Sequence, residues 1–155
     1  MPSQLRRLLP FVALAAALLA VAASAAGTLR ISTAQNATLH KRILVTTSGR
    51  TLYSLSAETH GRFVCTGSCL STWPPLILKH GAKPVGVRGL GSIKRPDGRR
   101  QATYRGKPLY RFSGDMKKGD ANGEGFKDVG TWHAAPAPKS SASHSSPPPT
   151  PSPGY

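Results

Sequence analysis

Two cysteines, Cys65 and Cys69, are the residues of this chain best suited to chemistry. A disulfide between them would close a five-residue loop, for which the chain-entropy estimate of stabilisation is about 2 kcal/mol. Two thiolates at this spacing could instead bind copper, with His60 or His80 as a further ligand. A dithiol redox centre prefers the shorter C-x-x-C spacing. We therefore predict a structural disulfide, with an extracytoplasmic copper-binding or redox protein as the alternative.

The remaining polar residues form no catalytic pattern. Serines and histidines are present, but the chain has neither a nucleophile-elbow motif nor a metalloprotease motif. Residues Asp120 to Gly125 begin like a calcium loop, yet Thr131 stands where that loop needs a bidentate glutamate, so we interpret the segment as a glycine-rich turn. The sequence predicts a protein that is not an enzyme and that holds no metal or other cofactor.

The N-terminus has the features of a secretory signal peptide. Arg6 and Arg7 precede an apolar run from Leu8 to Ala23, and the small-x-small site Ala23-Ser24-Ala25 completes the pattern. The apolar run is shorter than the ~20 residues that a membrane-spanning helix needs. We expect residues 1–25 to be removed and the protein to be secreted or extracytoplasmic, in the cell envelope, where thiols oxidise.

A short pattern occurs twice in the exported part, at a distance of 57 residues. The second copy contains Tyr110, Phe112 and Asp115, and the first contains Tyr53, Leu55 and Glu58. A tryptophan follows each copy, Trp73 in the first and Trp132 in the second. The pattern indicates an internal duplication, with repeat 1 at about 40–78 and repeat 2 at about 90–133.

We interpret these eight repeated residues as structural. Alternation along a strand places the first and third positions of each copy on one sheet face. The acid falls where the strand ends and can accept hydrogen bonds from turn amides, a role for which Glu58 is less suited because its side chain is longer. We expect each tryptophan to close its own repeat, and the aromatic side chains to be largely buried in one core with approximate twofold symmetry. These aromatic residues are Tyr53, Trp73, Tyr110, Phe112 and Trp132.

Strand signals dominate the segment between the signal peptide and residue 133. Alternating segments meet at turn signals such as Pro96-Asp97-Gly98, which is typical of a hairpin. We predict a mostly β protein, a small antiparallel domain over 26–133 built from two divergent tandem repeats, with a short helical turn near residues 67–73. The segment 134–155 is rich in proline and serine, lacks apolar periodicity and is predicted to be a disordered tail.

Several short motifs resemble one known family, the bacterial secreted proteins and lipoproteins with a Y-x-[FWY]-x-x-D repeat. The resemblance covers about residues 40–135 and rests on Gly49-x-Thr51-Leu52-Tyr53, Cys65-x-Gly67-x-Cys69-x-x-x-Trp73-Pro74-Pro75-Leu76, Tyr104-x-Gly106-x-Pro108-Leu109-Tyr110-x-Phe112-x-x-Asp115, Gly119-Asp120-x-x-Gly123-x-Gly125 and Trp132. The first copy departs from the motif at Leu55 and Glu58, and no lipid-accepting cysteine stands near the predicted cleavage site. The resemblance implies an extracytoplasmic location and a repeat layout, and it implies no activity.

The chain is strongly basic, with a formal net charge of +15. Without residues 1–25 it keeps 19 basic and 6 acidic residues, a net charge of +13. The surplus lies mainly between Lys94 and Lys118, and the residues that flank turns there should project outward: Arg99, Arg100, Arg105 and Lys107. We predict salt-sensitive binding to an anionic envelope surface, either lipid headgroups or wall polymer, rather than to nucleic acid. The sequence does not identify a protein partner.

Overall fold

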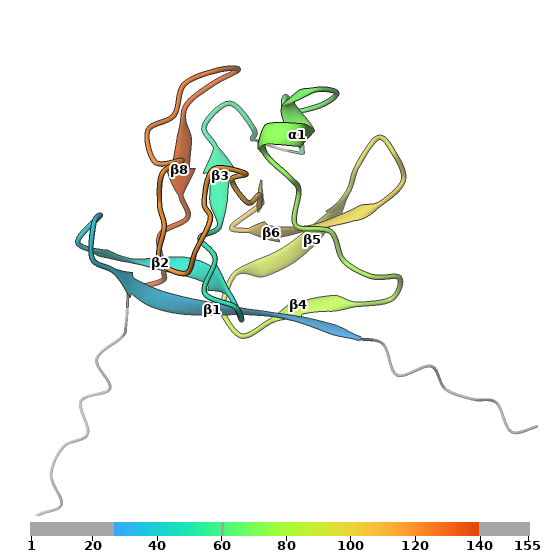
Figure 1. Ribbon diagram of the computed structural model, residues 1–155. Coiled ribbons are helices and arrows are strands. Elements are labelled where there is room, and N and C mark those ends of the chain that lie inside the picture. The colour runs from blue at the N-terminus through green and yellow to red at the C-terminus, as the bar shows by residue number, and fades with distance from the viewer. Residues whose placement is uncertain (1–26, 60, 140–155) are drawn as a thin grey trace, which may run out of the picture.

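The computed structural model describes residues 27–59 and 61–139, which form short strands and one helical turn (Figure 1). The elements are β1 (Thr28–Asn36), β2 (Lys41–Thr46), β3 (Tyr53–Leu55), α1 (Cys69–Thr72), β4 (Lys83–Val85), β5 (Leu90–Lys94), β6 (Arg100–Tyr104), β7 (Lys107–Pro108) and β8 (Trp132–Ala134). The predicted mostly β fold with a short helical turn is confirmed. The predicted signal peptide, His60 and residues 140–155 of the predicted tail lie outside the described residues.

The strands form three small sheets. β1 pairs antiparallel with β2 and parallel with β4, and β5 to β7 form an antiparallel meander. The turn between β5 and β6 lies at Pro96-Asp97-Gly98, as predicted, with Gly98 in the left-handed region at φ 82°. β3 leaves the β2 hairpin after Thr51 and pairs antiparallel with β8, so the two elements stand side by side in Figure 1.

The two repeats are joined by an exchange of the segments that follow the tryptophans. The segment after Trp73 lies in the second repeat, where the Leu76 amide donates to the Leu109 carbonyl at 2.9 Å and the Leu76 carbonyl accepts from Ala102 at 2.9 Å. The segment after Trp132 makes the equivalent bonds in the first repeat. There the Ala135 amide donates to Leu52 and its carbonyl accepts from Leu44, both at 2.8 Å. Each repeat is therefore completed by the other.

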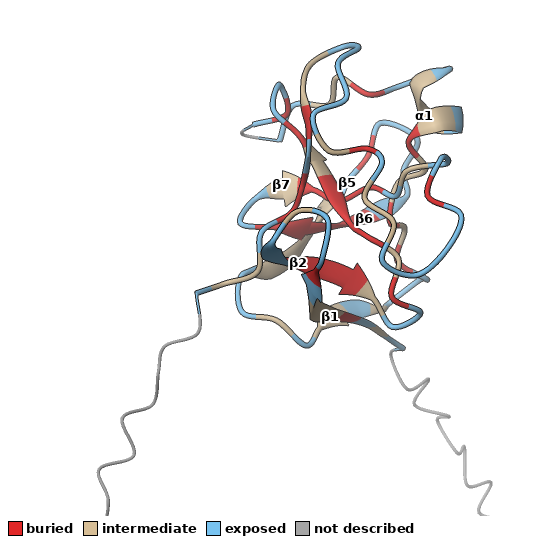
Figure 2. Cartoon of the chain, turned by 60° about the vertical axis from the view of Figure 1, so that its left-hand side comes forward, coloured by how far each residue is buried: buried red, intermediate tan, exposed pale blue. Residues whose placement is uncertain are grey.

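Tyr53 and Tyr110 meet where the two repeats face each other. Each donates its backbone N–H to the carbonyl of the other at 2.9 Å, which is the pattern expected at an approximate twofold axis. Neighbouring positions contribute to two apolar clusters, because successive side chains of a strand point to opposite faces. Tyr53 and Tyr110 belong to one cluster and Leu52 and Leu109 to the other, so both clusters contain residues of both repeats. Figure 2 shows buried residues along β2 and β6.

The fold continues past the predicted boundary at residue 134. Ala134 belongs to β8, Ala135 is 1% exposed, and the Ala137 amide donates to the Arg42 carbonyl at 3.0 Å. This segment lies alongside β2, where Pro136 forms an antiparallel bridge with Ile43. Among the described residues, no helix is long and apolar enough to cross a membrane.

We expect Gly123→Ala to destabilise the fold by about 1–3 kcal/mol, the usual cost of overpacking a core. A Cβ at this position would lie 2.7 Å from Trp73 and 3.0 Å from Tyr53, and both rings are fully buried. Gly27→Ala is the matched control, since its nearest neighbour is 3.9 Å away. Urea unfolding of both variants measures the difference, and equal stability would contradict this packing.

Candidate functional site

Each tyrosine of the duplicated motif binds the acid of the other repeat. The Tyr53 hydroxyl donates to Asp115 Oδ2 at 2.7 Å, and the Tyr110 hydroxyl lies 2.8 Å from Glu58 Oε2 and 3.0 Å from Glu58 Oε1. All four residues are buried, with at most 2% exposed. Because a buried carboxylate is costly without strong partners, each acid stabilises the fold only while its tyrosine from the other repeat is in place.

Both acids also accept backbone amides, so the expected weaker role of Glu58 is wrong. Glu58 Oε1 accepts from Val64 and Cys65 at 2.9 Å each, and Asp115 Oδ1 accepts from Asn122 at 2.9 Å. The extra methylene of Glu58 lets its carboxylate reach two successive amides of the cysteine loop. Both acids therefore accept turn amides, as predicted. Each acid also binds the tyrosine hydroxyl of the other repeat.

The environment of the tyrosines keeps their hydroxyls protonated. Burial raises the pKa of Tyr53, and the hydrogen bond to Asp115 and its charge raise it further. Burial also raises the pKa of Tyr110, with Glu58 acting in the same direction and Arg95 opposing it. The stability that these hydroxyls give is therefore complete below the ordinary tyrosine pKa of about 10 and declines as the pH rises above it.

The two tryptophans stack on each other instead of each closing its own repeat. Their ring centroids are 3.8 Å apart and the planes differ by 9°. Asp128 joins them from the side, accepting the indole N–H of Trp73 at 3.2 Å and of Trp132 at 2.8 Å. Each ring still meets its own tyrosine edge-on, at 5.4 Å for Tyr53 and 5.0 Å for Tyr110. One aromatic stack is therefore shared by both repeats.

Phe112 is only partly buried, which corrects its expected place in the core. Its ring lies against Trp73 at 4.5 Å and against Phe126 at 5.6 Å, at the edge of the stack. The amides of Arg111 and Ser113 donate to Pro74 and Thr72, and Phe112 between them covers the edge of the stack. Leu55, its counterpart in the first repeat, is fully buried beside Trp132.

Arg95 lies inside the protein although sequence reasoning placed it in the exposed basic surplus. It is 3% exposed and donates to the Tyr110 hydroxyl at 3.3 Å and to the Cys65 carbonyl at 3.2 Å, as well as to the Gln101 side chain. Its positive charge compensates the buried Glu58 through the tyrosine hydroxyl that both contact. Arg95 is 30 residues from Cys65, so the sequence does not reveal that the two residues pair.

The predicted disulfide between Cys65 and Cys69 is confirmed, with the Cα atoms 5.4 Å apart. Cys65 is fully buried and its amide is held by Glu58, so the bond fixes the loop that receives the first-repeat acid. In this oxidised form the thiolate pair on which the copper alternative depends is absent. His80 is exposed in the turn before β4, and among residues 27–59 and 61–139 no three His, Cys, Asp or Glu side chains are grouped to hold a metal ion.

The four basic residues selected from the sequence do not form one surface. Arg99 and Arg100 lie at the tip of the β5–β6 hairpin, where Arg99 is paired with Asp97 at 2.7 Å and lowers the pKa of that carboxyl through this bond. Arg105 and Lys107 lie at the opposite end of β6. These four residues were selected because they flank turns. The turns lie at the two ends of β6, so the residues lie in different parts of the molecule.

Arg105 instead joins cations from distant parts of the chain. A groove of about 830 Å³ is lined by Arg42 of β2, Arg88 before β5, Arg105 and Lys139. All four are exposed, no acidic residue lines the groove, and none of the four makes an ion pair within the described part of the chain. Arg42, Arg88 and Lys139 were missed because they lie outside the dense basic stretch, and only the tertiary fold brings them together.

A double-mutant cycle tests the exchange of tyrosines and acids. Combining Tyr53→Phe with Asp115→Asn should give a coupling energy of about 1–2 kcal/mol, as for residues in direct contact. The control cycle combines Tyr110→Phe with Asp115→Asn, two residues of the same repeat that form no hydrogen bond with each other. Their coupling energy should stay below about 0.5 kcal/mol. Denaturant unfolding supplies all free energies, and stronger coupling within the repeat would overturn the exchanged arrangement.

Comparison with known proteins finds one similarity. Residues 91–136 match the model of a family described as a secreted repeat of unknown function. No curated protein and no solved structure matches the chain. The matched residues run from β5 through β8 and include Tyr110, Asp115 and Trp132. The family description confirms the predicted extracytoplasmic location, and the second repeat of this chain is similar to the secreted repeats of unknown function that this family model describes.

Proposed function

We propose that this protein is a non-enzymatic binding domain of the cell envelope, which holds a phosphate-bearing anionic polymer in the groove formed by Arg42, Arg88, Arg105 and Lys139. The observation that carries the proposal is the gathering of four exposed cations in a concave surface without an acid. Guanidinium groups bind phosphate through paired hydrogen bonds, and three of the four cations are arginines.

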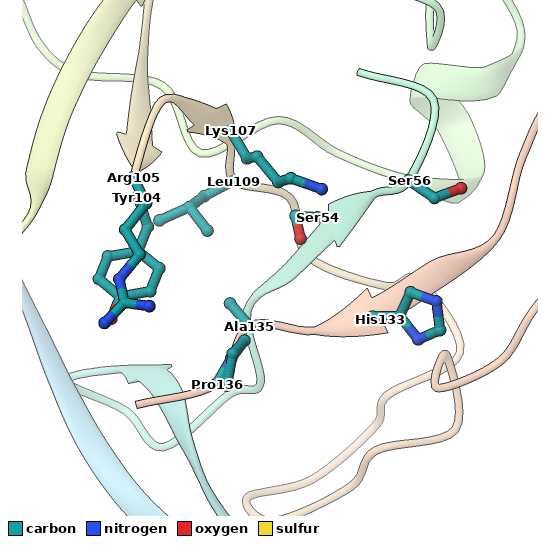
Figure 3. A pocket seen from close by; sticks show the side chains of 9 residues that line it. All are labelled: Ser54, Ser56, Tyr104, Arg105, Lys107, Leu109, His133, Ala135 and Pro136. Atoms are coloured by element: carbon teal, nitrogen blue, oxygen red, sulfur yellow. The ribbon is translucent and has the colours of Figure 1, made fainter. Parts of the chain in front are cut away.

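A non-enzymatic role is supported by the surroundings of the most reactive polar groups. Ser54 and His133 are partners across β3 and β8, and the His133 imidazole lies 3.2 Å from the Glu124 carboxylate. No hydrogen bond joins Ser54 to His133, and Figure 3 shows the imidazole directed away from the serine hydroxyl. A hydrolytic serine needs such contact with its base.

The shape of the groove favours a polymer strand over a flat bilayer. The four cations stand around a hollow, where a narrow chain can contact several of them at once. No acidic residue lines the groove, and Glu124, which accepts the amide of Ala134 close to it, is paired with Lys41 and His133. The attraction should weaken steeply with salt as bound counterions are released.

The test is co-sedimentation or titration with long-chain inorganic polyphosphate at low and high salt. Changing Arg42→Ser, Arg88→Ser and Arg105→Asn together should weaken binding about a hundredfold, since each cation near an anionic surface contributes about 1 kcal/mol. Asparagine is chosen at position 105 because the backbone there has φ 49°, which asparagine tolerates.

The matched control removes the same charge elsewhere, with Lys94→Ser, Arg99→Ser and Arg100→Ser at the β5–β6 hairpin. The affinity of this variant should stay within about threefold of that of the unaltered protein. Salt screens the effect of charges that lie far from the groove. Equal loss in both variants would mean that net charge alone drives binding, and absence of binding at low salt would refute the proposal. Stronger binding to phosphatidylglycerol vesicles than to polyphosphate would assign the groove to a membrane surface.

A further inference from the structure

A second cavity adjoins the cationic groove and differs from it in chemistry. It has a volume of about 280 Å³ and lies between the outer face of the β3–β8 pair and the β6–β7 turn (Figure 3). Arg105 and Pro136 line both the cavity and the groove. The cavity is lined by Ser54, Ser56, Tyr104, Arg105, Lys107, Leu109, His133, Ala135 and Pro136.

The floor of this cavity is apolar. Leu109 and Ala135 are at most 1% exposed and belong to the same core cluster, and the Tyr104 ring lies beside them at 4% exposed. The Tyr104 hydroxyl is buried and finds no hydrogen-bond partner among the described residues. Since an apolar cavity of about 150 Å³ holds benzene, a cavity of about 280 Å³ above this floor has room for a short alkyl chain.

The rim is cationic and polar. The Arg105 guanidinium stands over the Tyr104 ring at 5.2 Å, and Figure 3 shows Lys107 extending across the cavity toward Ser54. Ser54 of β3 lines one side with its hydroxyl, and none of the lining residues is acidic. A ligand that fits must therefore combine an apolar body with an anionic end, because an apolar ligand alone would leave the two cations unpaired.

We infer that this cavity binds a single-chain amphiphile with an anionic phosphate head. The alkyl chain lies on Leu109, Ala135 and the Tyr104 ring, and the head is bound by Arg105 and Lys107 with the Ser54 hydroxyl as a further donor. Binding here does not require the polymer proposed for the groove, although a phosphate polymer that carries an alkyl anchor at one end could occupy both.

The experiment is a titration with octyl phosphate below its critical micelle concentration, followed by calorimetry and by NMR of methyl groups. Saturable binding with shifts of the Leu109 and Ala135 methyl signals is expected. Octyl trimethylammonium has the same chain with a cationic head and should bind at least tenfold more weakly. Inorganic phosphate alone should shift neither methyl signal, because it carries nothing to fill the floor.

Ser54→Phe fills the cavity from β3 without entering the core, since Ser54 points away from buried Tyr53 and Leu55. It should abolish octyl phosphate binding and leave polyphosphate binding unchanged. Lys107→Ser should weaken octyl phosphate about fivefold, the loss of one cation near an anionic head. Arg88→Ser is the matched control, because Arg88 lines only the groove, and should not affect this ligand.

Several results would overturn the inference. They are absence of octyl phosphate binding to the unaltered protein, equal binding of the cationic amphiphile, and full binding by a folded Ser54→Phe variant. Thermal unfolding verifies that the Ser54→Phe variant is folded. If this variant fails to fold, the methyl shifts of the unaltered protein test the inference. Polyphosphate binding is measured separately, so failure of the amphiphile with retained polymer binding would leave the groove proposal standing.

Discussion

The pair of hydrogen bonds between tyrosine and carboxylate across the two repeats is the interaction on which the rest of the structure depends. Asp115 and Glu58 are buried, and a buried carboxylate without partners would be too costly for a domain of this size. Each acid is satisfied by a hydroxyl from the other repeat and by amides of its own loop. The loops, the disulfide and the tryptophan stack are thereby held in a single arrangement.

The sequence was sufficient for the features that arise from local pattern. Alternation and turn residues predicted the strands and the β5–β6 hairpin, and the close spacing of Cys65 and Cys69 predicted their bond. The duplication was visible because both copies keep the tyrosine and the tryptophan. The burial of Glu58 shows that it keeps the core position of Asp115, whereas Leu55 is fully buried and its counterpart Phe112 is only partly buried.

The features that were missed all depend on contacts between distant segments. An acid five residues after a tyrosine suggests a hydrogen bond between these two residues within one turn. Only the tertiary structure shows that each acid binds the tyrosine of the other repeat. Arg95 looks like any surface arginine until its burial against Tyr110 is seen. The groove unites residues 42, 88, 105 and 139, a set that no spacing in the sequence indicates.

The exchange of the segments after Trp73 and Trp132 has a consequence for any chain that carries one repeat alone. Such a chain would lack the segment that pairs with its residue equivalent to Leu109. It would also lack the tyrosine hydroxyl that hydrogen-bonds its own acid. It could obtain both by pairing with an identical copy, in the manner of a strand-swapped dimer. The tandem arrangement seen here corresponds to that dimer with its subunits covalently fused, which replaces a concentration-dependent association by a loop closure within one chain.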